Sequence, residues 1–260
     1  MTTSFFASLA ILLTCYLFYN LNNFVLSYTM ALYTDHRWPG GTRLNSIRTH
    51  RGTLVEMAEH PKWGVTCYMD GEIQSCESDE AIYHASLVHP AMESVETPRR
   101  VLIVGGGEGA TAREVLKWPV TRVDMVEWDR DVLRLFKKTY RQWAKGAWED
   151  PRLHLRTEDI MDVIDVEPTE PYDVILIDLF DPTEETREQW KEIFIRLSEW
   201  LAPGGSLMAY AGMKGALSLP TWELCEWVEG VITRYDVTIP SFEGVCEFIG
   251  YRATGVFHGV

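Results

Sequence analysis

The sequence lacks several features that mark common classes of protein. No residue from Met1 to Thr34 is charged, and only 24 Lys and Arg residues stand against 38 Asp and Glu residues. The formal net charge of −14 argues against a nucleic-acid partner, because such binding depends on cations that meet phosphate groups. The same charge suits a cationic substrate, although acidic solubility is its commoner cause.

The cysteines also show no pattern typical of disulfide bonds or of a metal site. There are five of them, an odd number, and none forms a CxxC pair: Cys15, Cys67, Cys76, Cys225 and Cys246. We therefore expect reduced thiols in a reducing compartment and no bound metal.

The uncharged N-terminal segment is almost wholly apolar between residues 5 and 33. This length exceeds the roughly 20 residues that a helix needs to cross a bilayer, so we expect a membrane anchor. Two alternatives stay open. One is a signal peptide, which the absence of Lys or Arg before the apolar run disfavours, and the other is a helix docked on a partner subunit. Four arginines follow and favour a globular part on the cytoplasmic, stromal or matrix side: Arg37, Arg43, Arg48 and Arg51.

We expect the chain to divide into three parts. Residues 1–37 form the hydrophobic segment, residues 38–97 a small β domain with a short helix, and residues 98–260 a nucleoside-binding domain. In the small domain the alternating runs predict strands at 42–49, 53–57, 64–68 and 72–76, with a hairpin turn at Asp70-Gly71. A helix is expected to begin at Ser78 and to end at Pro90.

A glycine-rich turn organises the third part. Residues 101–104 are four apolar residues typical of a buried strand, and Gly105, Gly106, Gly107 and Gly109 follow them. Glycines at such a turn let a ligand lie against the backbone, and a helix is expected from Glu108 to about residue 117. Since Glu108 brings a negative charge into the turn, the ligand is expected to carry positive charge.

Strands and helices alternate after the glycine turn, which predicts a methyltransferase-like Rossmann fold. Its sheet is expected to be mostly parallel with an antiparallel last strand, because no helix separates the final two strands. The expected strands are 101–104, 122–127, 152–156, 172–177, 206–210, 235–239 and 245–251, and the expected helices are 131–143, 185–201 and 219–232.

Each of the first four strands is followed by an acidic residue: Glu108, Glu127, Asp159, and then Asp178 with Asp181. Ligands of such sheets bind at the carboxyl ends of the strands. The two oxygens of Glu127 suit the hydroxyls of a ribose, and Asp159 suits an adenine amino group. The other three acids remain for a cationic group.

Several motifs together resemble the polyamine aminopropyltransferases, the spermidine synthase family, and most closely the thermospermine synthase branch. The resemblance covers roughly residues 45–252. The motifs are Asp70–Gln74, Asp79–His84, His89-Pro90, Gly105–Gly109 with Arg113-Glu114, Val126–Asp129, Asp178–Pro182 and Ile239–Phe242.

This resemblance implies transfer of an aminopropyl group from decarboxylated S-adenosylmethionine to a polyamine, either spermidine or putrescine. Asp178 would orient the amine and accept its proton, Tyr83 would hold the amine, and Glu108 would bind the donor's ammonium with support from Asp181. The nucleoside would lie on Gly105, Gly107, Glu127 and Asp159, with Gln74 and His84 in supporting roles. A homodimer is one expected assembly, since the family is often dimeric or larger.

The sequence departs from the family at three places near the acceptor. Arg51 lies in the nearest counterpart of a Tyr-Gln pair, Tyr210 replaces a Gln, and residues 183–186 replace a Gly-Pro loop. These departures and the apolar N-terminus leave a second reading open, a catalytically degenerate accessory subunit of a membrane complex. A methyltransferase that uses S-adenosylmethionine itself is a third.

Overall fold

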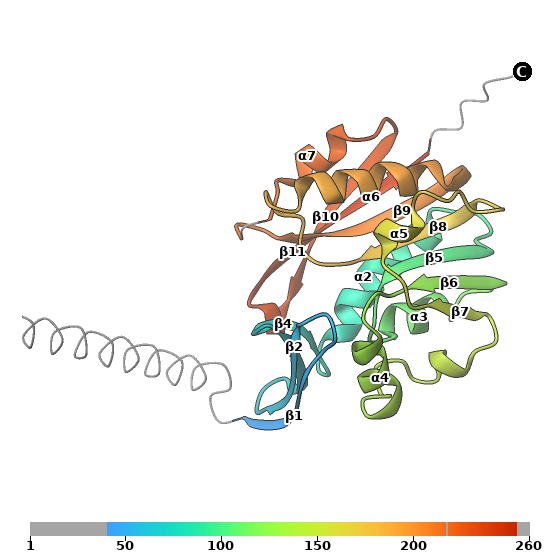
Figure 1. The fold of residues 1–260 in the computed structure, drawn as a ribbon. Coiled ribbons are helices and arrows are strands. Elements are labelled where there is room, and N and C mark those ends of the chain that lie inside the picture. Colours follow the sequence, from blue (N-terminus) through green and yellow to red (C-terminus); the bar gives the residue numbers. More distant parts are fainter. Residues whose placement is uncertain (1–40, 217, 254–260) are drawn as a thin grey trace, which may run out of the picture.

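A computed structural model describes residues 41–216 and 218–253, which form two β-sheets with helices packed around the larger one (Figure 1). The smaller sheet is antiparallel and follows chain order: β1 (Thr42–Arg48), β2 (Leu54–His60), β3 (Gly64–Met69) and β4 (Glu72–Cys76). The turn at Asp70-Gly71 is confirmed, with φ of 48° and 91° at the two residues. The Asp70 carboxylate accepts the backbone N–H of Leu54 at 2.9 Å and so ties this turn to β2.

Helix α2 (Glu80–Glu93) connects the two sheets and carries Tyr83 and His84. Its expected end at Pro90 is wrong, because the helix continues to Glu93. A proline has no N–H to donate to the carbonyl oxygen four residues earlier, here that of Ser86. The hydroxyl of Tyr235 donates to this oxygen instead, so a tertiary contact replaces the missing bond.

The larger sheet has seven strands in the order β10-β11-β9-β8-β5-β6-β7. Strands β5 to β9 are parallel, whereas β11 lies antiparallel between β9 and β10. The expected sheet with an antiparallel last strand is confirmed. Its strands are β5 (Arg100–Gly105), β6 (Arg122–Val126), β7 (Leu153–Arg156), β8 (Tyr172–Asp178), β9 (Leu201–Met213), β10 (Val231–Ile239) and β11 (Gly244–Arg252).

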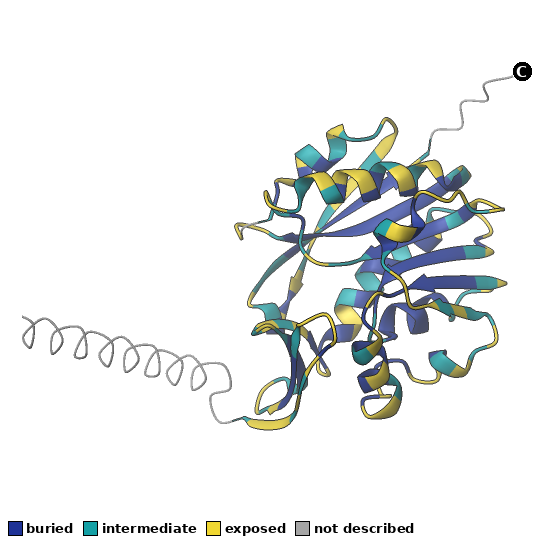
Figure 2. Cartoon of the chain, in the orientation of Figure 1, coloured by how far each residue is buried: buried dark blue, intermediate teal, exposed yellow. Residues whose placement is uncertain are grey.

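Helices cover both faces of this sheet, and its central strands are buried along most of their length (Figure 2). One face holds α2 and α3 (Ala110–Val115), and α4 (Arg130–Lys138) packs between this layer and the small sheet. The other face holds α5 (Ile160–Val163), α6 (Arg187–Glu199) and α7 (Thr221–Glu226). Two 3₁₀ turns complete the elements, η1 (Ala147–Glu149) and η2 (Pro240–Phe242).

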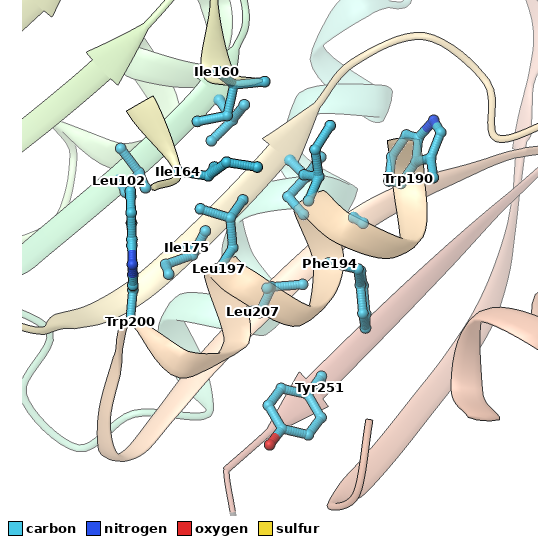
Figure 3. Close-up of a cluster of buried hydrophobic side chains, with 14 of the residues drawn as sticks. Leu102, Ile160, Ile164, Ile175, Trp190, Phe194, Leu197, Trp200, Leu207 and Tyr251 are labelled. Atoms are coloured by element: carbon cyan, nitrogen blue, oxygen red, sulfur yellow. The ribbon is translucent and has the colours of Figure 1, made fainter. Parts of the chain in front are cut away.

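Helix α6 shows how sequence spacing builds this core. Trp190, Phe194 and Leu197 recur at helical spacing, and all three are fully buried. They pack toward Ile175 of β8 and Leu207 of β9 (Figure 3).

Two expected helices are shorter than the sequence indicated. The helix expected over 131–143 ends at Lys138, since Tyr140 and Trp143 turn inward to pack on Phe136. Of the helix expected over 219–232, only α7 forms. Gly230, which precedes β10, lies so close to Tyr251 that an added Cβ would be 2.4 Å from its ring.

The apolar segment 5–33 lies outside the described residues. In the two ranges that the structure does describe, no helix is long and apolar enough to cross a membrane.

Candidate active site

The glycine loop between β5 and α3 fits closely between two of the predicted acids. Gly105 and Gly106 have φ of 85° and 75°, where a side chain is strained. A Cβ atom on Gly105 would also lie 2.0 Å from the backbone oxygen of Asp178. One on Gly107 would lie 3.0 Å from Oε2 of Glu127. The loop therefore needs glycine for both conformation and space.

The parallel register gathers the strand-end acids at one edge of the sheet, which we call the rim. Strand β5 pairs with β8 on one side and with β6 on the other, and β6 pairs with β7. Parallel strands end at the same edge, so Asp178, Glu127 and Asp159 lie along it. Glu108 and Asp181 belong to the loops that follow β5 and β8.

Asp178 lies half-buried near the middle of this edge, and two hydroxyl groups hold its carboxylate. Tyr83 of α2 donates to Oδ1 at 2.9 Å, and Thr111 of α3 donates to Oδ2. Burial, with Asp178 nearby, raises the pKa of Tyr83 well above its usual value. The phenol therefore stays protonated and fixes the orientation of the carboxylate.

Glu108 is joined to His84. Nε2 of His84 lies 2.8 Å from Oε1 of Glu108, and Nδ1 lies 3.0 Å from Oε2 of Glu80. Burial alone would lower the pKa of His84, but the ion pair and hydrogen bonds with these acids raise it to about 10. Burial raises the pKa of Glu108, and the imidazolium opposes that rise. We conclude that His84 is a cation between two carboxylates.

The alternation of charge continues from Glu80 into α3. Arg113 donates to both oxygens of Glu80, at 2.9 and 2.8 Å, and its Nε donates to Glu114 at 2.9 Å. Burial would raise the pKa of Glu80, but the bonds from His84 and Arg113 lower it to about 2. A buried line of alternating charges thus ties α2 and α3 to the glycine loop.

Glu127 has a different environment. It is buried, and its Oε1 accepts the N–H of Asp129 at 2.8 Å. Burial is the main cause that raises the pKa of Glu127 to about 7, and the charges of Asp129 and Asp178 add to the rise. The hydrogen bond from Asp129 acts in the opposite direction and lowers the pKa. Two carboxylate oxygens beside the glycine loop match the two hydroxyls of a ribose.

Asp159 already has a cation beside it. Its Oδ1 caps α5 by accepting the N–H of Met161 at 3.1 Å, whereas Oδ2 lies 3.4 Å from Nη1 of Arg51. The guanidinium of Arg51 also lies over the Trp128 ring, with Cζ 4.6 Å from the ring centroid. The arginine that departs from the family pattern is therefore paired with an acid of the rim.

Asp181 lies in a loop that is fastened to the segment between β9 and α7. Its Oδ2 accepts the hydroxyl of Ser218 at 3.0 Å, and the N–H of Leu219 donates to the carbonyl of Pro182 at 2.6 Å. Burial, with Asp181 nearby, raises the pKa of Tyr210. The rings of Tyr210 and Tyr83 meet edge to face at 5.4 Å, which gives this side of the site an aromatic wall.

Gln74 is the predicted residue that the structure does not bring to this group. It is exposed, and its amide donates to the carbonyl of Glu72. Its neighbour Ser75 turns inward and donates to Glu108 at 3.3 Å. An irregularity in the β3–β4 pairing, between Cys67 and Tyr68, shifts the register beside it, and a sequence pattern does not reveal such a shift.

Four cysteines lie in the described part of the chain, and all are free thiols: Cys67, Cys76, Cys225 and Cys246.

Although the sequence gives no sign of a metal site, one group of side chains in the described part of the chain has potential ligand atoms within 4.8 Å of one another, namely His50, Asp129 and Asp131. His50 bonds to Asp131 through both its backbone N–H and its ring.

The fold is a doubly wound α/β fold, and its rim of acids lies where ligands of such sheets bind. The family model for the spermine/spermidine synthase domain matches residues 80–220. The chain belongs to this family.

Curated relatives agree with this assignment. The polyamine aminopropyltransferase of Aeropyrum pernix is 36% identical over 197 residues, which cover 72% of this chain and 62% of the relative. Polyamine aminopropyltransferase 2 of Pseudomonas aeruginosa is 40% identical over 67% of this chain and 52% of its own length. The enzyme of Sulfurisphaera tokodaii is 41% identical over 76% of this chain and 67% of its own. The chain thus spans only part of the length of these relatives.

Solved structures agree on the fold. A spermidine synthase in complex with the transition-state analogue AdoDATO has a TM-score of 0.73 and 26% identity, covering 81% of this chain and 73% of that one. Spermidine synthase from Thermotoga maritima has a TM-score of 0.71 at 24% identity, covering 81% and 72%.

Proposed function

We propose that this chain transfers an aminopropyl group from decarboxylated S-adenosylmethionine to a polyamine and releases methylthioadenosine. One observation carries the proposal. Asp178 is held by Tyr83 at 2.9 Å beside a glycine loop that bears a second acid, Glu108. A glycine loop suits a nucleoside and gathered acids suit a cation, and this donor is both.

The rim acids divide between the two halves of the donor. Glu127 accepts the ribose hydroxyls, and Asp159 accepts the amino group of the base. Glu108, with His84 behind it and Asp181 in support, faces the ammonium of the donor. Acids gathered in this way repel one another, and a bound cation relieves that repulsion.

The reaction is a displacement at the methylene next to the sulfonium. The amine nitrogen of the acceptor forms the new C–N bond, the C–S bond breaks, and its electron pair goes to sulfur. Asp178 accepts the proton that the amine loses, while Tyr83 keeps the carboxylate oriented. Most of the rate then comes from holding two cations in line and screening their repulsion.

For the acceptor we favour spermidine over putrescine. This preference rests on the resemblance of Glu108 in the loop, Asp178–Pro182 and Ile239–Phe242 to the thermospermine branch.

The experiment gives the purified full chain decarboxylated S-adenosylmethionine with putrescine, spermidine or spermine, and measures methylthioadenosine. We expect product with spermidine and a loss of about 10²- to 10⁴-fold in kcat for Asp178→Asn. Asp162→Asn, an exposed acid on α5, serves as the matched control and should behave as the wild type. No product with any of the three amines would sink the proposal, and undiminished turnover by Asp178→Asn would remove its assigned role.

A second candidate is a degenerate accessory subunit of a membrane complex. The cation of Arg51 beside the rim and the apolar residues 5–33 favour it.

For either function we propose that residues 5–33 attach the chain to a membrane, with the globular part on the cytoplasmic, stromal or matrix side. Alkaline extraction of membranes from cells that express the full chain tests the attachment, since release into the supernatant would contradict it.

A further inference from the structure

The connection between β1 and β2 reaches from the small sheet onto the rim of the large one. The backbone N–H of His50 donates to Oδ2 of Asp131 at 2.9 Å, and its ring Nδ1 lies 3.0 Å from the same oxygen. These two contacts fix the tip of the hairpin at the start of α4. The next residue, Arg51, is thereby placed over the ends of β6 and β7.

Arg51 makes two contacts of different kinds there. Its Cζ lies 4.6 Å from the centroid of the Trp128 ring, which is a stacking cation–π contact. Its Nη1 lies 3.4 Å from Oδ2 of Asp159, the oxygen that does not cap α5. A planar cation therefore lies on an aromatic face and points an N–H edge at a carboxylate.

Trp128 and Asp159 have the features of a seat for an aminopurine, which we call the base seat. Trp128 directly follows Glu127, and its side chain is 44% exposed, which is unusual for so large an apolar group. We take a nucleoside whose ribose lies on Glu127 to place its base on the ring of the next residue, Trp128. The amino group of that base would then meet Asp159.

A guanidinium and an aminopurine present the same chemistry to this base seat. Both are flat, both stack on aromatic rings, and both carry N–H donors at one edge. At 4.6 Å from the ring centroid the guanidinium leaves no space for a base between itself and Trp128. The two cannot occupy the base seat together.

We propose that Arg51 is a placeholder in the base seat, and that the nucleoside binds only after the Arg51 side chain swings away. The inference rests on the proposed function, because it takes the ligand to be an adenine nucleoside. The His50 contacts can persist while the long Arg51 side chain changes rotamer. Arg51 thus acts as a competitor that lowers the apparent affinity for the donor and for the product.

The size of this effect follows from the two contacts that Arg51 gives up. One cation–π contact and one partly exposed ion pair weaken nucleoside binding by about 3- to 30-fold, since the apparent dissociation constant is divided by the fraction of protein with an open seat.

The test is calorimetric titration of methylthioadenosine into the full-length wild type and three variants. Arg51→Ala is expected to bind about 3- to 30-fold more tightly than the wild type. Arg51→Lys keeps the ion pair without the planar stack, so its affinity should fall between the two. Arg141→Ala removes another exposed arginine that pairs with a glutamate, Glu149, away from the seat, and should match the wild type.

Weaker or unchanged binding by Arg51→Ala would overturn the placeholder, since Arg51 would then contact the nucleoside or play no part. If the wild type makes product while Arg51→Ala binds no more tightly, the inference fails and the proposed function stands. If Arg51→Ala binds more tightly but no amine yields product, the seat stands and the transferase activity fails. Absence of methylthioadenosine binding in every variant would overturn both.

Discussion

His84 Nε2 lies 2.8 Å from Oε1 of Glu108, so a buried imidazolium from α2 holds the acid of the glycine loop. The other ring nitrogen faces Glu80, which Arg113 clasps with two bonds. The loop acid is therefore fixed before any substrate arrives.

Removal of this imidazolium should be costly. His84→Ala leaves Glu108 buried without its cation, so we expect the free energy of unfolding to fall by about 3–5 kcal/mol near neutral pH. Urea unfolding measures this loss. Arg141→Ala, which breaks an exposed pair with Glu149, should cost no more than about 1 kcal/mol. Equal losses in the two variants would contradict a buried ion pair.

The same variant tests how the stability that His84 contributes depends on pH. The folded pKa of His84 is about 10, above its ordinary value of about 6.5. A base whose pKa is higher in the folded state than in the unfolded state contributes its full stabilisation at pH values below the unfolded-state pKa. This contribution is lost as the pH rises through the folded-state pKa. The stability difference between wild type and His84→Ala should therefore shrink between about pH 6.5 and pH 10. A constant difference over this range would contradict the charged form of His84.

Tyr83→Phe tests the bond to Asp178 while it keeps the aromatic ring. We expect kcat to fall about 10- to 100-fold, because the carboxylate loses the donor that orients it. Tyr172→Phe is the matched control, since its hydroxyl donates to Asp124 at 3.1 Å, outside the rim. That variant should lose about 0.5–1.5 kcal/mol of stability and keep its kcat. A similar fall in kcat for both would show that Tyr83 acts through stability alone.

Glu127 predicts how nucleoside binding depends on pH. Burial raises the pKa of Glu127 to about 7, and ribose hydroxyls donate best to the ionised carboxylate. Methylthioadenosine should therefore bind more tightly as pH rises through about 7 and reach a plateau above it. Titrations from pH 5.5 to pH 8.5 measure this change, and Glu127→Gln should bind weakly at every pH. A wild-type affinity that does not change over this range would contradict the assignment.

The rim could be predicted because it depends on local patterns. Apolar runs that end in Glu127, Asp159 and Asp178 mark strand ends, and parallel strands bring their ends together whatever the details of packing. The fold class follows from the same alternation of strands and helices.

Contacts between distant segments could not be predicted in this way. The inward turn of Ser75 depends on an irregular register in the small sheet, and the Arg51–Asp159 pair joins residues 108 positions apart. The helix through Pro90 depends on Tyr235, which no local pattern connects to Ser86. Each is decided by tertiary packing rather than by propensity.

The C-terminal region also fastens the start and the middle of α2, which has a consequence for biosynthesis. Ser241 donates to the Asp79 carboxylate through its backbone N–H at 2.7 Å and through its hydroxyl at 2.8 Å, and Tyr235 donates to Ser86. On the ribosome the glycine loop and the first strands emerge long before these residues. Helix α2 therefore receives its last fastenings only when residues 235–241 have been translated, and Tyr83 and His84 reach their final positions at that late step of folding.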